Sequence, residues 1–284
     1  MQIVRETGRL DRIRALLTLR EASRRRVVLA LVGLTLLLLA LSGWGFWRLA
    51  QELTSGEALV ASSQVLNLVM FGLSLVAALG TAFLSGPTLS GETESGAVLS
   101  VLARPVRRWA WLLGKWLGLV VFGGVYVVVA GFALCLVVLA TVGYWPPHPL
   151  AGLLLLAGQT AVLLTLSVLL ATVVSPMASG VVSVGLFGAA WIAGVVGGVG
   201  SALGNEGVAR VGTVSRVVLP TDGMWRGAMH AFQDPSALVA MGPSAEAFPF
   251  LSVSSPTPAY LVWAALWVAM VFCLAAAVVA RKDL

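Results

Sequence analysis

The sequence is poor in charge. Asp, Glu, Lys and Arg make up 11% of its 284 residues, whereas soluble domains usually carry about 25%. Hydrophobic residues make up 59%, and the mean hydropathy is +0.97. A globular fold cannot hide that much apolar surface beneath a polar shell. The composition therefore excludes a soluble protein and predicts an integral membrane protein.

Cysteine and histidine are also scarce. Cys135 and Cys273 both fall inside apolar runs, which predicts small hydrophobic residues and neither a disulfide nor a metal pair. His148 and His230 are far apart and have no Cys or carboxylate at metal-ligand spacing, so no metal site is expected. The first 26 residues are polar and rich in arginine, unlike a cleaved signal peptide.

Several kinds of chemistry lack the residues that they need. Gly114–Lys115 is the one suggestive Gly–Lys pair, but a P-loop would require glycine in place of Trp109 and serine or threonine in place of Trp116. An intramembrane serine protease would require a GxSG-type nucleophile and a histidine within a span, and this chain has neither. The apolar runs hold no Asp, Glu or Lys, which disfavours an ion-driven carrier. No catalytic set is predicted.

What the sequence does contain is a series of long apolar runs. A transmembrane helix needs about 20 apolar residues, and its backbone groups must be paired within the helix. Proline interrupts the long uncharged tract at Tyr144–Pro149 and at Ser175–Ser179. We therefore predict an all-α integral membrane protein with a membrane domain over 27–284. Its six spans are expected at 27–47, 58–84, 116–142, 150–174, 180–199 and 259–280.

The basic residues lie beside alternate spans. Eight arginines precede the first span, four basic residues lie between the second and third, and Arg281 and Lys282 follow the last. With both termini cytoplasmic, 14 of the 18 basic residues face the cytoplasm, which agrees with the positive-inside rule. This predicts a multi-pass protein of the cell inner (cytoplasmic) membrane. It also explains the net charge of +6 more simply than nucleic-acid binding does.

Two segments are expected to lie along the cytoplasmic interface. Residues 1–26 form an amphipathic segment, in which leucine and isoleucine recur at helical spacing over Leu10–Leu19. That pattern fits a helix on an anionic inner leaflet, or an orientation signal alone. A helix from Pro105 to Val142 would be about 57 Å long, too long for one bilayer. Its first part is therefore expected to lie at the interface, with Trp109 and Trp111 at headgroup depth, before the helix bends inward.

The external loop, 200–257, also predicts helices. Asn205 is placed to cap a helix that Pro220 would end, and Asp222 to cap a second one through Phe232. Asp234–Pro235 opens a third. The second is amphipathic, with Met224, Trp225, Met229 and Phe232 on its apolar face. These helices are expected to rest on the outer membrane face or to cap the spans.

Neutral polar side chains occur inside two of the predicted spans. They are Ser63, Gln64, Asn67 and Ser74 in the second span and Gln159 and Thr160 in the fourth. Ser63, Asn67 and Ser74 share one helix face. Such groups form hydrogen bonds between helices, or they line a path for a weakly polar or amphiphilic cargo.

The region between the second and third spans, 85–115, concentrates charge. It holds Glu92, Glu94, Arg104, Arg107, Arg108 and Lys115, and no charged residue follows until Glu206. Ser95 is placed to cap a short helix, Gly96–Ala103, which is too apolar for a free loop. Such a helix either lies on the lipid or inserts into a groove of a partner, and the arginines contact lipid phosphate or that partner.

This region resembles the signature of ABC-2 type transporter permeases. That family has an E-x-E-x-G stretch after the second span, an apolar turn, a proline with a nearby arginine, and Gly–Lys opening the third span. The matching residues are Glu92, Glu94, Gly96, Leu99, Leu102, Pro105, Arg108, Gly114 and Lys115. The arginine-rich start, the six spans and the basic–Asp–Leu tail (Arg281–Leu284) are also similar. The external segment between the last two spans is longer than in the polysaccharide and lipid exporters.

The resemblance implies a transport subunit that is not itself an enzyme. Gly96–Ala103 would be a coupling helix that docks on a separate ATP-binding subunit. The coupling surface would include Glu92, Glu94, Gly96, Leu99, Leu102, Arg104, Pro105, Arg108 and Lys115. Two permease chains, identical or paralogous, and two ATPase chains would form an exporter, with ATP and Mg²⁺ bound by the partner ATPase and no cofactor bound by this chain. The alternative function is a membrane scaffold or sensor that couples an ATPase to an external partner without moving cargo.

Overall fold

A computed structural model describes residues 2–53, 55–94, 108–241 and 248–281 of the chain, and side chains for residues 27–53, 61–85, 109–236, 238–239 and 248–281. These residues form helices and no strand. The helices are α1 (Gln2–Glu52), α2 (Ser55–Glu94), α4 (Arg108–Val142), α5 (Pro149–Ala171), α6 (Pro176–Ala202), α7 (Glu206–Val218), α8 (Thr221–Phe232), α9 (Pro235–Met241) and α10 (Pro258–Arg281).

Six helices are long and apolar enough to cross a membrane, as predicted. They cover Val27–Glu52, Ala61–Ser85, Trp109–Val142, Pro149–Ala171, Pro176–Ala202 and Pro258–Arg281. Each overlaps one predicted span. The breaks on either side of α5 fall at the proline-rich stretches that the sequence singles out, and Ser175 caps α6 by accepting a hydrogen bond from the Ala178 amide.

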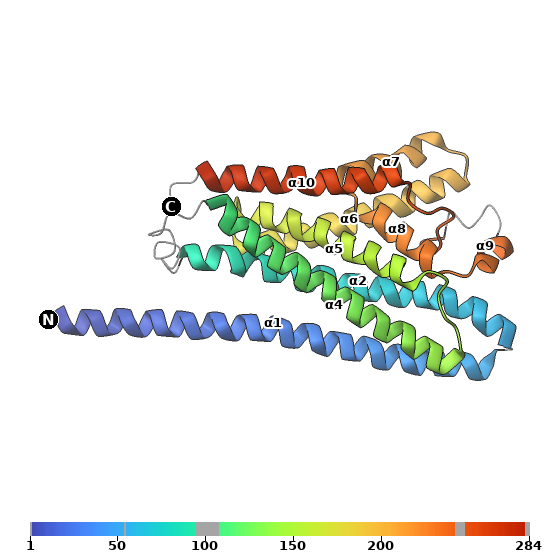
Figure 1. Cartoon of the computed structure of the whole chain (residues 1–284), viewed down its shortest axis with the longest axis horizontal. Helices are drawn as coiled ribbons and strands as arrows, with labels where there is room; N and C mark the ends of the chain where they lie inside the picture. Colours follow the sequence, from blue (N-terminus) through green and yellow to red (C-terminus); the bar gives the residue numbers. More distant parts are fainter. Residues whose placement is uncertain (1, 54, 95–107, 242–247, 282–284) are drawn as a thin grey trace.

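The six spans form a bundle with two different ends (Figure 1). At the termini end, α1 begins, α2 ends, α4 begins and α10 ends. At the other end, which we call the loop end, α7, α8 and α9 are packed around the ends of the spans. The even number of spans brings the start of α1 and the end of α10 to the same side of the bundle.

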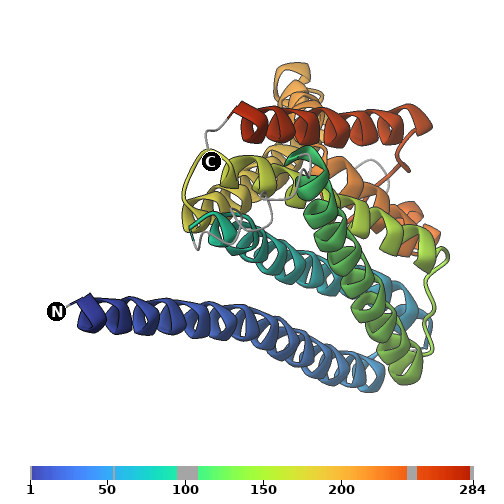
Figure 2. The same ribbon diagram turned by 60° about the vertical axis from the view of Figure 1, so that its left-hand side comes forward.

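Two helices differ from the expected course. The predicted interfacial segment and the first span are one helix, α1, of 51 residues, or about 77 Å at 1.5 Å per residue. Its N-terminal half diverges from the other helices (Figure 2). α4 is a single helix of 35 residues that crosses the bundle diagonally (Figure 1). The sequence predicts an interfacial first part followed by a bend, whereas these residues form one helix whose diagonal course fits a longer helix into the length of the bundle.

The core lies between α2, α4, α5 and α8. Its largest buried side chains include Leu66, Met70 and Leu73 of α2, and Leu153 and Leu156 of α5. α8 contributes Trp225 and Phe232 to the same cluster. Cys135 is buried there as a free thiol, and Cys273 is a free thiol on the exposed side of α10. The outer faces of the spans carry exposed Leu, Val and Trp side chains, as lipid contact requires.

Candidate functional site

The segment Glu206–Phe232, which we call the re-entrant segment, enters the bundle. Its first helix, α7, begins at Asn205, whose side chain accepts a hydrogen bond from the Val208 amide as predicted. α7 then runs back along α6. The Gly212 backbone lies against Gly197, and the Ser215 hydroxyl donates to the Ala190 carbonyl at 3.4 Å. The chain therefore descends from the loop end toward the middle of the bundle.

The second helix, α8, climbs back to the loop end along α5. Met224 lies against Gly158, and Phe232 lies against Gly152, so the two helices are antiparallel. The Tyr144 hydroxyl donates to the Phe232 carbonyl at 2.7 Å and anchors the end of α8. Burial raises the pKa of this phenol, which keeps it a donor at physiological pH. Of the two expected positions, on the membrane face or capping the spans, the first is wrong for α8, since its apolar face packs into the core formed by the spans.

Contacts with three spans indicate how deep the turn between α7 and α8 lies, and those from α10 begin two residues into that helix, at Tyr260, and reach to Trp267. Asp222 lies against Gly194, eight residues before the end of α6, and Met224 lies against Gly158, nine residues after the start of α5. Trp267, nine residues into α10, contacts the Val218 carbonyl. At 1.5 Å per residue the turn lies about 12–14 Å below the loop ends of the spans. In a bilayer with a hydrocarbon core of about 30 Å, this is hydrocarbon depth.

The backbone of this turn is hydrogen-bonded by side chains of α10. The Trp263 indole donates to the Val217 carbonyl at 3.1 Å, and the Trp267 indole donates to the Val218 carbonyl at 2.8 Å. The Tyr260 hydroxyl lies 3.2 Å from the Pro220 carbonyl and 3.3 Å from that of Arg216. Irregular backbone at membrane depth is tolerated only where its polar groups are satisfied inside protein. α10 supplies those partners here.

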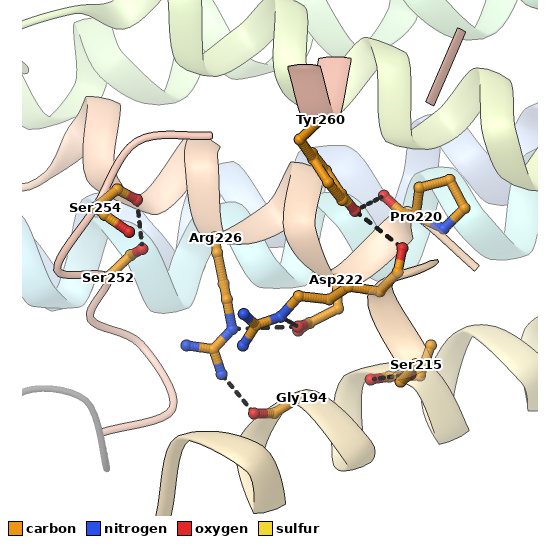
Figure 3. A network of polar contacts seen from close by, with 10 residues as sticks. Gly194, Ser215, Pro220, Asp222, Arg226, Ser252, Ser254 and Tyr260 are labelled. Carbon is orange, nitrogen blue, oxygen red and sulfur yellow. Dashed lines mark hydrogen bonds and ion pairs between the residues drawn. The ribbon is translucent and has the colours of Figure 1, made fainter. Parts of the chain in front are cut away.

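Three charged side chains meet beside the turn (Figure 3). Asp222, whose side chain is 1% exposed, accepts hydrogen bonds at one oxygen from the Nε atoms of Arg216 at 3.0 Å and Arg226 at 3.1 Å. Arg226 also donates to the Gly194 carbonyl of α6 at 2.6 Å. Asp222 lies in the first turn of α8, where the helix dipole favours a negative charge. One carboxylate thus holds two guanidinium groups, and the cluster carries a net charge of +1.

A cavity of about 340 Å³ adjoins this cluster. Arg216 and Arg226 line it together with Tyr260, backbone and hydroxyl groups of the stretch Ser252–Thr257, and Ser201 at the end of α6. The Ser252 hydroxyl donates to the Ser254 carbonyl at 3.2 Å, which shapes one wall (Figure 3). Asp222 is not a lining residue, because it lies behind the two arginines. The cavity wall therefore presents positive charge and polar groups.

Sequence reasoning missed this cluster. The sequence suggests that Asp222 caps α8, but the structure begins that helix after Pro220, and the Asp222 carboxylate bonds arginines. The three charged residues lie between the fifth and sixth spans, in a segment predicted to stay outside the bundle. The absence of Asp, Glu and Lys from the spans therefore does not exclude charge inside the bundle, because this segment folds back into it. The available signal is the spacing Arg216, Asp222, Arg226 within a stretch rich in Trp, Met and Phe.

The polar residues proposed for a cargo path face the interior. Ser63, Asn67, Ser74, Gln159 and Thr160 are buried, and Gln64 is half-buried. The Ser74 hydroxyl donates to the Gln159 side-chain oxygen at 3.0 Å and joins α2 to α5. The Thr160 hydroxyl bonds the Leu156 carbonyl of its own helix. These contacts are of the kind that hold membrane helices together, and the lining of a cargo path stays a hypothesis.

Asn67 lies beside an aromatic cluster. Its amide donates to the Phe250 carbonyl at 2.9 Å, and the Phe71 ring, one turn further along α2, lies 4.8 Å from Trp191, 5.3 Å from Trp225 and 5.6 Å from Phe250. Within the part of the chain that the structure describes, the Asn67 carbonyl oxygen and the indole N–H groups of Trp191 and Trp225 are buried without a hydrogen-bond partner. Unpaired buried polar groups are uncommon and mark positions where a polar ligand gains hydrogen bonds.

The residues proposed for ATPase coupling are described only in part. The backbone of Glu92 and Glu94 forms the last turn of α2, and Arg108 is the first residue of α4. The Lys115 ammonium lies 4.8 Å from the centre of the Trp111 ring. Gly96, Leu99, Leu102, Arg104 and Pro105, and with them the predicted helix Gly96–Ala103, lie outside the described residues.

Among known proteins, no family model matches the chain, and no curated protein matches it either.

Proposed function

We propose that this chain is the transmembrane permease subunit of an ATP-binding cassette exporter. The observation that carries the proposal is the sequence of the region 85–115 at the termini end of a six-span bundle. α2 continues past the apolar run predicted at 58–84 as far as Glu94, and so extends about 15 Å beyond that run. The acidic pair of the motif therefore lies at a distance from the bilayer where a soluble subunit can reach it.

Charge at the same end supports the proposal. The start of α1 carries eight arginines, and α10 ends at Arg281. Both lie at the end of the bundle to which α2 and α4 bring the motif (Figure 1). A cytoplasmic termini end is the orientation that positive charge favours. The motif then faces the compartment that contains ATP.

The interior of the bundle supports a transport role. The aromatic cluster of Phe71, Trp191, Trp225 and Phe250 lies next to polar groups that have no partner in the described residues. Such a mixture suits an amphiphilic cargo, whose apolar part contacts the rings and whose polar part pairs with the indole and amide groups. A second copy of this chain, or a paralogue, would complete the path.

The test is a reconstitution of this chain with an ATP-binding cassette ATPase subunit, sought among the proteins that co-purify with the tagged wild-type chain. The wild-type pair is expected to co-purify and to hydrolyse ATP in nanodiscs. Replacing Leu99 and Leu102 by Asp is expected to leave membrane insertion intact, abolish co-purification and reduce ATP hydrolysis to that of the isolated ATPase. The charge would prevent the apolar helix from entering a groove of the partner.

The matched control is Leu203→Asp, which adds a charge at an exposed position of the loop end. It is expected to retain both co-purification and hydrolysis. If the Leu99→Asp, Leu102→Asp chain still binds the ATPase, docking at this region is wrong. If the pair assembles but none of the tested amphiphiles crosses the membrane or changes the ATPase rate, the scaffold or sensor function replaces transport.

A further inference from the structure

We propose that the cavity beside Asp222 is a binding site for an anionic oxygen ligand, a phosphate or carboxylate group that enters from the loop end. The inference concerns the opposite end of the bundle from the region that couples to the ATPase and does not depend on that coupling. It rests on the residues that line the cavity, on how the two arginines are held, and on the position of the cavity along the spans.

The lining of the cavity has the chemistry of an anion site. Two arginines face it and, among the described residues, no Asp or Glu does. Guanidinium groups bind carboxylate and phosphate through paired N–H donors. Ser255 and Thr257 also line the cavity, and their hydroxyl groups add neutral donors. Among the residues that the structure describes, this surface offers a cation no carboxylate.

The buried carboxylate fixes the arginines in place. Asp222 contacts Arg216 and Arg226 through their Nε atoms, so each guanidinium is held at its inner edge. Arg216 has no other side-chain partner among the described residues and is 32% exposed. Its terminal nitrogens therefore lie where a ligand oxygen can reach them. A prearranged donor loses little conformational entropy on binding.

The cavity lies at the loop end of the bundle, where a bilayer would place its headgroups. It extends from the arginines near the turn up to Ser201, next to the last residue of α6, and to Tyr260 in the first turn of α10. It therefore runs along roughly the outer 12–14 Å of the spans, from headgroup level at their loop ends to the arginines at hydrocarbon depth. A volume of about 340 Å³ holds a headgroup-sized group and is at the lower limit of small-molecule sites. The ligand is thus an anionic lipid headgroup or a free small anion.

The experiment measures binding to the purified full-length chain without an ATPase, so that its failure is distinct from a failure of coupling. One arm follows the thermal unfolding midpoint in neutral detergent as inorganic phosphate replaces chloride at constant ionic strength. The other counts bound phosphatidylglycerol and phosphatidylcholine by native mass spectrometry. If the site binds free anions, phosphate is expected to raise the unfolding midpoint. If it binds a lipid headgroup, the chain is expected to retain phosphatidylglycerol in preference to phosphatidylcholine.

Arg216→Gln is the test variant, and Arg210→Gln is its matched control. Both remove one positive charge from α7, but Arg210 lies outside the cavity and pairs with Glu206 on an exposed face. Arg216→Gln is expected to weaken phosphate or phosphatidylglycerol binding by about tenfold or more, the value of a charge-assisted hydrogen bond. Arg210→Gln is expected to leave that binding within about twofold of wild type.

A second variant keeps the test valid if Arg216→Gln unfolds. Ser255→Asp places a negative charge at an exposed position of the cavity wall and leaves the Asp222 cluster intact. It is expected to reduce binding of the same probe by repulsion. The proposal is overturned if neither phosphate nor phosphatidylglycerol binds the wild-type chain. It is also overturned if Arg216→Gln and Ser255→Asp bind the probe as tightly as Arg210→Gln does.

Discussion

At the residue scale, the most informative side chain is Asp222. It is nearly inaccessible to solvent and is the counter-charge of two arginines. An ionised group at hydrocarbon depth is stable only when it is paired and hydrogen-bonded within protein. Gly194 makes the pairing possible, because a Cβ atom at that position would overlap the Asp222 carboxylate. One missing side chain on α6 thus makes room for the charge that organises the cavity.

Asp222→Asn is expected to destabilise the folded chain by about 3 kcal/mol, because it removes a buried charge and leaves two half-buried guanidinium groups without a counter-charge. Chemical or thermal unfolding in detergent measures the change. Glu206→Gln is the control, since it breaks a surface pair with Arg210 whose side chains are 87% and 78% exposed, and it is expected to cost at most about 1 kcal/mol. Equal losses from the two substitutions would show that the Asp222 cluster contributes no more than a surface pair.

Asn205 and Asp222 show what local sequence patterns can predict. Asn205 follows a glycine and precedes an amphipathic run, and its side chain caps α7 as predicted. Asp222 has the same local signature of a cap. Its partners are one arginine six residues earlier and another four residues later, on two different helices. Capping depends on neighbouring residues, whereas the pairing of a buried charge depends on how the helices pack.

At the element scale, the contact between α6 and α7 depends on glycine. A Cβ atom at Gly197 would lie 2.6 Å from the Gly212 Cα, and one at Gly200 would lie 2.5 Å from the Ala209 amide nitrogen. Backbones approach this closely only where side chains are absent. The close approach allows α7 to descend beside α6, so the glycine-rich end of the fifth span is explained by the return of the chain into the bundle.

Gly197→Val is expected to push α7 away from α6 and to lower stability by about 1–3 kcal/mol, the usual cost of overpacking. Gly185→Val is the matched control, because it makes the same change on the same helix at an exposed position with no neighbouring atom within 4 Å. Unfolding of both variants in the same detergent gives the comparison. A similar loss for the two would attribute the effect to the helical propensity of valine and not to the contact with α7.

The spans and the helices α7 and α8 could be predicted, but the return of these two helices into the bundle could not. Hydropathy and the positions of proline predict all six spans, and each predicted range overlaps the observed helix over most of its length. α7 and α8 are 13 and 12 residues long, and an amphipathic helix of that length looks the same on a membrane surface and inside a bundle. Its location depends on complementary features far away in sequence, such as Gly152 and Gly158 on α5 and the indoles of α10.

At the scale of the whole molecule, the bundle is asymmetric from end to end. The termini end carries the motif region, the arginine-rich start and the end of α10, whereas the loop end carries the re-entrant segment and the cavity. The predicted orientation assigns the first end to the cytoplasm and the second to the outside. The two candidate sites are then exposed to different compartments.

Cysteine labelling tests this orientation. In a background of Cys135→Ala and Cys273→Ala, a membrane-impermeant maleimide is expected to label Glu206→Cys in intact cells. Glu92→Cys is expected to react only after the cells are permeabilised, because the positive-inside rule assigns the end of α2 to the cytoplasm. Labelling is read from the mass of the purified chain. The reverse pattern would invert the topology and remove the motif region from the compartment that contains ATP.

The anchoring of α10 has a mechanical consequence. Near the loop end, this helix is hydrogen-bonded to the turn of the re-entrant segment by Tyr260, Trp263 and Trp267. Near the termini end, it packs against Leu112 of α4 and Val168 of α5 through Ala275 and Val279. No glycine interrupts α10, and its one proline is its first residue, so the helix is stiff over about 36 Å. Leu112 lies three residues before Lys115. A displacement of the start of α4 is therefore expected to move α10 as one stiff body and, through Tyr260, to shift the wall of the cavity at the opposite end.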